Sequence, residues 1–231
     1  MDSWRELFGQ QVDCIIASQF HIAAGLSETD FINNYLQPLE QLLDDSCAGL
    51  EPTANRVPFL IVVPNNIVTL SYQLKSVRER RHDTQMEYIV KPEWFKNAKE
   101  VRTPDKPYLL IGVETGAAML NIPPKKCVAA FHKEGRVPLT IDEGLALITH
   151  FPEVLESHWI DLPGSELIHK CAGEDARQRG MLGALPPAFG LATFVPTFYY
   201  KYYNSLRLYF VYEMTETPYS GSASGARRLA L

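Results

Sequence analysis

The stretch from Tyr108 to Leu155 constrains the fold more than any other part of the chain. It begins with YLLIGV (108–113), a short run of apolar, β-favouring residues that predicts a buried strand. A proline pair at 123–124 then begins a helix that Gly135 ends. The sequence TIDE at 140–143 has Thr and Glu at the spacing of a capping box, in which each side chain binds a backbone N–H near the helix start. The stretch therefore predicts a strand followed by two helices.

The N-terminal region, residues 1–45, predicts a helical hairpin. Apolar residues at helical spacing indicate one helix over 4–24. Ser27 caps a second helix, with Asp30 in the third position, and Pro38 kinks or divides that helix. Each helix has an apolar face that must be covered, so we expect the hairpin to pack against the rest of the domain.

Strands are predicted elsewhere from short apolar runs between turn residues, over 57–64, 85–90 and 159–162. A short helix is expected over 92–98, begun by its proline. Residues 194–213 hold nine Tyr or Phe residues on either side of an Asn-Ser turn and predict an aromatic β-hairpin.

Helices followed by strands, interspersed helices and a hairpin favour an α+β fold. We expect the N-terminal helical hairpin to pack on a mixed sheet that is completed by the C-terminal aromatic β-hairpin. An α/β arrangement is the alternative. Residues 1–217 are expected to form a single globular domain, and the small, polar residues 218–231 predict a flexible tail.

Composition excludes several classes of protein. The chain has 231 residues and a net charge of −5, a balance that does not favour nucleic acid, whose binding needs clustered Lys and Arg. No apolar run approaches the ~18 residues of a membrane-spanning helix, and the start MDSWRELFGQQ does not resemble a signal peptide. Four widely spaced cysteines predict reduced thiols. We therefore expect a soluble, cytoplasmic protein that binds neither membrane nor nucleic acid.

No strong catalytic motif is present. The segment 112–116 (GVETG) lacks the three-glycine spacing of a dinucleotide site, and no Walker A sequence occurs. Ser165 has no second glycine two residues later, so a hydrolase elbow is unsupported. The residues His150, His158, His169 and Cys171 match no closed zinc pattern. The sequence therefore predicts no cofactor and no metal, and it favours a protein that is not an enzyme.

Candidate site residues lie near the second helix of the central stretch. Arg136 precedes the start of that helix at Thr140, where open N–H groups and a cation together suit an anion. His132 and His150 are the candidates for a general base. Asp142 and Glu143 diverge by ~100° on a helix, so capping explains them better than an acid–base pair does.

Two clusters have a functional and an ordinary interpretation. The basic run 78–82 suits a phosphate or an acidic ligand, whereas a solvated helix end, where cations complement the helix dipole, is favoured. The aromatic hairpin 194–213 suits stacking on a ring, whereas ordinary cross-strand pairing with one side on the core is favoured. If the sheet is one-sided, some of its rings are exposed, and the hairpin then suits a protein partner or self-association.

The sequence GRVPLTIDEG (135–144), continuing to Leu155, resembles a mostly bacterial family catalogued only as a domain of unknown function. Weaker matches at 25–28, 38–39, 57–63 and 108–113 extend this resemblance over about residues 10–165. The resemblance implies no assigned activity and no catalytic residues. Similar proteins continue after 164–165 into a segment rich in Trp, Gly, Asn and His, where this chain has the Tyr/Phe hairpin. Gly221-Ser-Ala-Ser resembles the end of that segment and implies a more ordered tail.

The sequence leaves two hypotheses for the function. A non-catalytic binding or protein-interaction domain is the leading hypothesis, since titratable groups show no convergent pattern and aromatic residues are abundant near the C-terminus. An enzyme or binding protein for a small anionic ligand, using Arg136 and Thr140, is the alternative.

Overall fold

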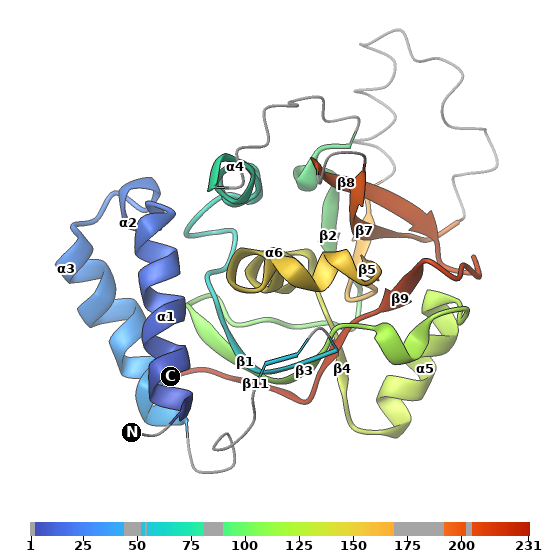
Figure 1. The fold of residues 1–231 in the computed structure, drawn as a ribbon, viewed down its shortest axis with the longest axis horizontal. Coiled ribbons are helices and arrows are strands. Elements are labelled where there is room, and N and C mark those ends of the chain that lie inside the picture. Colours follow the sequence, from blue (N-terminus) through green and yellow to red (C-terminus); the bar gives the residue numbers. More distant parts are fainter. Residues whose placement is uncertain (1–2, 44–51, 54, 81–89, 169–191, 202–204) are drawn as a thin grey trace, which may run out of the picture.

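The computed structural model describes residues 3–43, 52–53, 55–80, 90–168, 192–201 and 205–231 (Figure 1). Its helices are α1 (Ser3–Ala17), α2 (Phe20–Ala23), α3 (Glu28–Phe31), η1 (Ile32–Leu36), η2 (Gln37–Leu42), α4 (Leu70–Arg80), η4 (Pro92–Trp94), η5 (Ala117–Met119), α5 (Pro124–Lys133), α6 (Ile141–His150) and η6 (Pro152–Glu156). Its strands are β1 (Arg56–Val62), β2 (Phe95–Asn97), β3 (Tyr108–Glu114), β4 (Val137–Pro138), β5 (Trp159–Asp161), β6 (Ser165–Leu167), β7 (Phe194–Lys201), β8 (Ser205–Tyr212), β9 (Ser220–Ser222), β10 (Ser224–Gly225) and β11 (Arg227–Leu229). The predicted α+β class is confirmed.

The strand β3 is the centre of the main sheet. It pairs antiparallel with β1 along one edge and with β10 and β11 in succession along the other, and β4 pairs with β10. Residues 57–62 and 108–113 are all buried, which is why their sequences are continuously apolar rather than alternating. Both strands were predicted from that pattern.

The helix α6 lies across one face of the main sheet, and α4 packs on α6 (Figure 1). Nine of the ten residues of α6 are buried, from Ile141 to Thr149. A helix covered on nearly all sides in this way contributes most of its area to the core, which also holds Leu109 and Leu110 of β3. The predicted capping box is present at its start.

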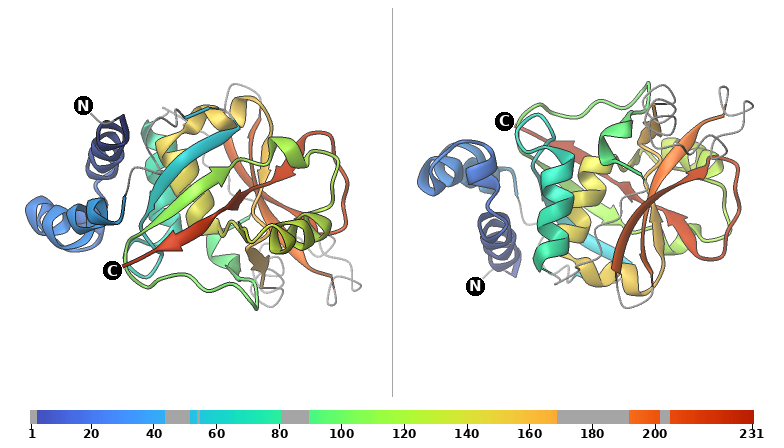
Figure 2. Two further views of the ribbon diagram at one scale, coloured as in Figure 1. Left: turned by 90° about the horizontal axis from the view of Figure 1, so that it is seen from below. Right: turned by 90° about the horizontal axis from the view of Figure 1, so that it is seen from above.

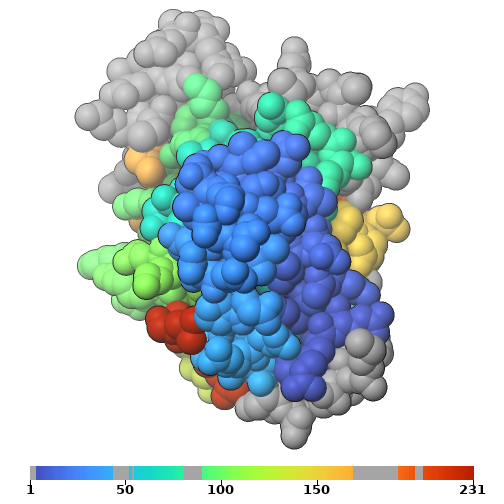
Figure 3. Space-filling model, turned by 90° about the vertical axis from the view of Figure 1, so that its left-hand side faces the viewer, coloured from blue at the N-terminus to red at the C-terminus, as the bar shows by residue number. Residues whose placement is uncertain are grey.

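The predicted N-terminal helical hairpin covers one side of the molecule (Figure 3). Its first arm divides where Gln19 takes a left-handed conformation, so α1 and α2 replace one continuous helix. The second arm passes from α3 through the π-turn η1 into the 3₁₀ turn η2, which holds the predicted Pro38 kink. The buried Gln11 of α1 accepts a hydrogen bond from Ile61 N–H (2.8 Å) and donates one to Phe59 C=O (3.0 Å), so α1 satisfies the outer edge of β1.

A second sheet holds the aromatic hairpin, in the order β8-β7-β5-β9. The strands β7 and β8 pair from Phe194–Tyr212 to Lys201–Ser205, and the predicted turn lies outside the described residues. The buried Asp161 of β5 ties three strands together, because it accepts hydrogen bonds from Thr197 Oγ1 (2.7 Å) and Ser220 Oγ (2.8 Å). Burial raises the pKa of Asp161. Because β9 is parallel to β5 while the other pairs are antiparallel, this sheet is mixed.

The prediction of a flexible tail over 218–231 is wrong. This segment forms β9 in the second sheet and then β10 and β11 in the main sheet, so it crosses the molecule and joins both sheets (Figure 2). Its small residues permit close packing: a Cβ on Gly116 would lie 2.4 Å from the carbonyl oxygen of Gly221. Composition alone suggested flexibility, whereas small side chains are what this crossing requires.

Two smaller expectations also change. The helix predicted over 92–98 is only the single turn η4, after which the chain becomes β2 and pairs with β6. Phe95 and Leu167 are buried in that pairing, so tertiary contact overrides the helical start. The strand predicted over 85–90 lies almost entirely outside the described residues.

Candidate functional site

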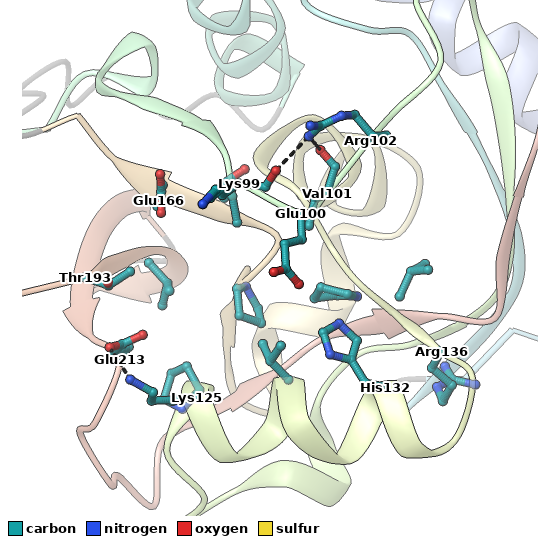
Figure 4. Close-up of a pocket in the computed structure, with 18 of the residues that line it drawn as sticks. Lys99, Glu100, Val101, Arg102, Lys125, His132, Arg136, Glu166, Thr193 and Glu213 are labelled. Carbon is teal, nitrogen blue, oxygen red and sulfur yellow. Dashed lines mark hydrogen bonds and ion pairs between the residues drawn. The ribbon is translucent and has the colours of Figure 1, made fainter.

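The first candidate site is a groove between α5 and the 98–102 loop, which we call the α5 groove (Figure 4). Its volume is about 670 Å³, within the range of ligand pockets. The walls come from α5, the 98–102 loop, the turn at 163–166 and the start of β7. The predicted residues His132 and Arg136 both line it.

His132 projects from the last turn of α5 into the groove. The Glu100 carboxylate projects into the same space from the opposite wall (Figure 4). His132 is exposed, so its ring is open to solvent as well as to the groove. This placement suits contact with a bound molecule.

Arg136 is occupied by internal partners. Its guanidinium donates to Ser224 Oγ (2.9 Å) and to the carbonyls of Gly112 (2.9 Å) and Ser224 (3.2 Å). It also lies 3.6 Å from Glu114 Oε1. These contacts fasten β10 to β3, so the main role that the geometry gives Arg136 is structural.

The start of α6 is closed rather than open. Thr140 N–H donates to Glu143 Oε2 (2.7 Å), Glu143 N–H donates to Thr140 Oγ1 (3.4 Å), and Ile141 N–H donates to Ser165 Oγ (2.9 Å). Thr140 is completely buried. An anion at this helix start would have to displace these groups.

Glu143 belongs to a buried network with the C-terminal strand. Arg228 of β11 donates to Glu143 Oε1 (2.6 Å) and Oε2 (2.9 Å), and Tyr108 O–H donates to Oε1 (3.0 Å). Burial, reinforced by the Glu143 carboxylate, raises the pKa of Tyr108 well above its ordinary value. The capping role of Glu143 is predicted from the sequence, whereas its pairing with Arg228, 85 residues away, is not.

His150 does not approach the groove. Its Nε2 lies 3.1 Å from the carbonyl of Ile61 in β1, and its buried Nδ1 has no hydrogen-bond partner in the described part of the chain. Burial lowers the pKa of His150 to about 4. His132 and His150 are therefore separate, and the four predicted residues do not form one catalytic centre.

The basic run 78–82 is described only as far as Arg80. Arg78 is buried, and Arg80 donates to Cys14 Sγ (2.7 Å) and to Thr149 C=O (2.8 Å). Arg80 therefore joins α4 to α1 and α6, and the solvated helix end that we expected does not describe the buried Arg78. The remaining two positions lie outside the described residues.

The aromatic hairpin shows the predicted cross-strand pairing, but it is not one-sided, because Val195 and Thr197 on the second face of β7 are buried as well. Phe194 and Phe198 are buried, whereas Tyr209 and Tyr212 are exposed. Phe194 packs against its cross-strand partner Tyr212 with ring centroids 5.7 Å apart. The exposed end of β8 leads into Glu213, which lines the α5 groove.

Some groove residues gave no signal in the sequence. Lys99, Glu100 and Arg102 fall in a loop that composition marks only as polar. These three residues line the groove because β2 pairs with β6, which places the loop that follows β2 opposite α5.

Residues 14–182 match a family of unknown function (DUF5701), and because this covers most of the chain, the protein belongs to that family. The family resemblance found in the sequence is thereby confirmed. No curated protein and no solved structure matches the chain. The match ends before the aromatic hairpin and the three C-terminal strands. These strands nevertheless belong to the main sheet and to the second sheet.

The described residues contain neither a membrane-spanning helix nor a group of metal-ligating side chains. None of their helices has the length and apolar character needed to cross a membrane. Within the same ranges, no three His, Cys, Asp or Glu side chains are grouped as metal ligands would be.

Proposed function

We propose that this protein is a polypeptide-binding domain and that a segment of the partner lies in the α5 groove, which binds that segment without catalysing a reaction on it. The observation that carries the proposal is the lining of this groove, in which apolar side chains alternate with charges of both signs. Its apolar members include Val101, Val128, Val137, Pro163 and Val195. A groove of this kind suits an extended segment whose apolar side chains bury area while its polar groups fix the register.

The charges favour an acidic partner segment. Lys125 pairs with Glu213 (3.1 Å), so that cation is already neutralised. Lys99 and Arg102 form no ion pair with any described residue, and Arg102 donates only to carbonyls of its own loop. Carboxylates on the partner would complement these two cations. Glu100 lies between them in the sequence and would repel a misplaced carboxylate.

The exposed end of the hairpin extends this surface. Tyr212 and Met214 are exposed on either side of Glu213, which forms part of the groove wall. Aromatic and Met side chains are enriched where proteins bind one another. This continuity supports the hairpin 194–213 as part of the partner surface.

The alternative of a small anionic ligand has less support. Binding at Arg136 and Thr140 would require Arg136 to release Ser224 and Gly112, and the N–H groups at the start of α6 already have acceptors.

A peptide library displayed on phage tests the proposal. We expect the wild-type protein to select peptides in which apolar residues are flanked by Asp or Glu, with affinities in the range of about 1–100 μM. The double variant Lys99→Glu/Arg102→Glu should weaken binding of a selected peptide about tenfold or more, since each like-charge contact costs on the order of 1 kcal/mol. Lys75→Glu on α4 is the matched control, because Lys75 is exposed and lies outside the groove. Selection of no peptide, or equal binding by the groove variant and the control, would contradict the proposal.

We also propose that the protein acts in the cytoplasm. Support comes from Cys14 and Cys127, which are both free thiols, as proteins in reducing compartments have. Fractionation of cells that express the full chain tests this. Recovery in a secreted or membrane fraction would contradict it.

A further inference from the structure

A second site lies at the junction of η6 and β5, where a serine and a histidine are hydrogen-bonded. Ser157 Oγ is 2.7 Å from Nδ1 of the adjacent His158. Nε2 of His158 is 2.9 Å from the carbonyl oxygen of Thr115. His158 is buried and Ser157 is exposed, so the pair joins the interior to the surface.

The Thr115 carbonyl fixes the tautomer of the neutral ring. A carbonyl oxygen only accepts hydrogen bonds, so Nε2 must carry the proton. Nδ1 then carries a lone pair, and the hydroxyl of Ser157 is the group that can donate to it. This is the relation of a nucleophile to a general base whose orientation is held by a third group.

The same contacts also accommodate the ring after it gains a proton. The Ser157 hydroxyl also has the carbonyl of Val154 as an acceptor (3.0 Å), so its one proton can go to Nδ1 of the neutral ring or to this carbonyl when Nδ1 is protonated. When Nδ1 is protonated it can donate to Ser157 Oγ while Nε2 still donates to Thr115. His158 therefore keeps a partner for each ring nitrogen in both protonation states.

A pocket of about 530 Å³ opens beside this pair. Its lining includes Ser157, His158, Trp159, Tyr200 and Tyr219. The Trp159 ring packs against Tyr219 with centroids 5.8 Å apart, and Tyr219 is 64% exposed, so an aromatic surface adjoins the hydroxyl. None of the residues that line this pocket lines the α5 groove.

We propose that Ser157 is a nucleophile that accepts acyl groups from carboxylic esters with an aromatic or other flat apolar group, and that His158 is its general base. In the first step Ser157 Oγ forms a bond to the ester carbonyl carbon while Nδ1 of His158 takes the hydroxyl proton. The carbon–oxygen bond to the alcohol then breaks, and the alcohol leaves with that proton. The acyl-serine is hydrolysed when water gives its proton to Nδ1, its oxygen bonds to the acyl carbon, and Ser157 Oγ leaves as the proton returns to it. Thr115 acts as a positioning residue through its carbonyl.

The test treats the full-length protein with 4-nitrophenyl acetate, followed by release of 4-nitrophenolate and by peptide mass spectrometry. We expect one acetyl group on Ser157. His158→Gln retains an amide that can donate to Thr115 but lacks a basic nitrogen, so it should fold and slow acetylation of Ser157 by about 100-fold, the usual contribution of general-base catalysis. In His158→Ala, added imidazole should restore part of the rate, which a purely structural histidine would not allow.

Ser27 supplies the matched control, since its exposed hydroxyl bonds to Asp30 Oδ2 (2.6 Å) instead of to a histidine. Ser27→Ala should leave acetylation unchanged, whereas Ser157→Ala should abolish it. Absence of acetylation at Ser157, acetylation mainly at another residue, or equal rates in wild type and His158→Gln would each overturn the proposal.

Discussion

The start of α6 and residues 220–225 of the C-terminal segment 220–229 are buried, yet the two regions are specified in different ways. The start of α6 is held by residues three positions apart, Thr140 and Glu143, whose mutual hydrogen bonds can be inferred from the sequence. The C-terminal segment is held by strands more than 60 residues earlier in the chain, namely β5, β3 and β4. The two regions meet where Arg228 contacts Glu143. Local and distant interactions thus hold one buried carboxylate, and variants can separate their contributions.

The largest expected effect is that of Arg228→Met. It leaves the fully buried Glu143 carboxylate without its cation, and removing one partner of a buried pair costs about 3–5 kcal/mol of unfolding free energy. Urea denaturation measures the loss. The double variant Arg228→Met/Glu143→Gln should recover most of it, because no uncompensated charge remains. A loss below about 1 kcal/mol in the single variant would show that the C-terminal segment contributes little.

Gly116→Ala should weaken the crossing of the C-terminal segment itself. Gly116 has φ of 100°, and a Cβ there would meet the backbone of Gly221. Backbone strain and overpacking together predict a loss of about 2–4 kcal/mol. Gly9→Ala is the control, because nothing lies within 4 Å of a Cβ at that position and α1 should gain slightly from it. Equal stability of the two variants would contradict the close approach.

The two ends of α6 should respond to pH in opposite directions. Burial raises the pKa of Asp142 to about 6, against ~3.9 in an unfolded chain. The folded protein therefore binds extra protons between these values, and the stability that Asp142 contributes below pH ~4 is lost as pH rises through ~6. For His150 the folded value of about 4 lies below the unfolded ~6.5, so its contribution is present above pH ~6.5 and is lost as pH falls toward 4.

Single variants separate these opposing effects. Relative to wild type, Asp142→Asn should gain stability as pH rises from 4 to 7, by up to about 3 kcal/mol. His150→Gln should gain by a similar amount as pH falls from 7 to 4. Urea denaturation at several pH values gives both slopes. Parallel curves for wild type and either variant would show that the group concerned has an ordinary pKa.

Thr140→Ala should have the smallest effect. It removes the hydroxyl that accepts from Glu143 N–H, and loss of an N-cap costs about 1 kcal/mol. The thermal midpoint measures this. A loss as large as that of Arg228→Met would mean that the local cap, rather than the distant pair, controls the region.

Sequence predicted those elements whose signals lie within a few residues of one another. The strands β1 and β3, the proline-started α5, the capped α6 and the aromatic hairpin are all of this kind. The helix expected over 92–98 was wrong because Phe95 and Leu167 bury each other across two strands. A helix-starting proline is a weaker influence than this pairing.

The candidate site was predicted only in part, for the same reason. His132 and Arg136 are four residues apart in the sequence, and both line the α5 groove. Lys99 and Arg102 approach them only after β2 pairs with β6, and Ser157 shows its relation to His158 only when Thr115 fixes the imidazole. None of these relations has a spacing in the sequence that could reveal it.

The sequence by itself determined the α+β class, the family, the capping box of α6 and the aromatic hairpin, because apolar periodicity and capping depend on neighbouring residues. The tertiary structure decided that the segment from Ser220 to Leu229 forms strands rather than a tail. Small residues such as Gly221 are compatible with a flexible chain or with close backbone packing, and only the presence of Gly116 opposite Gly221 selects the second. It likewise decided that Arg136 holds β10 to β3, since a guanidinium binds whichever acceptors the fold brings to it.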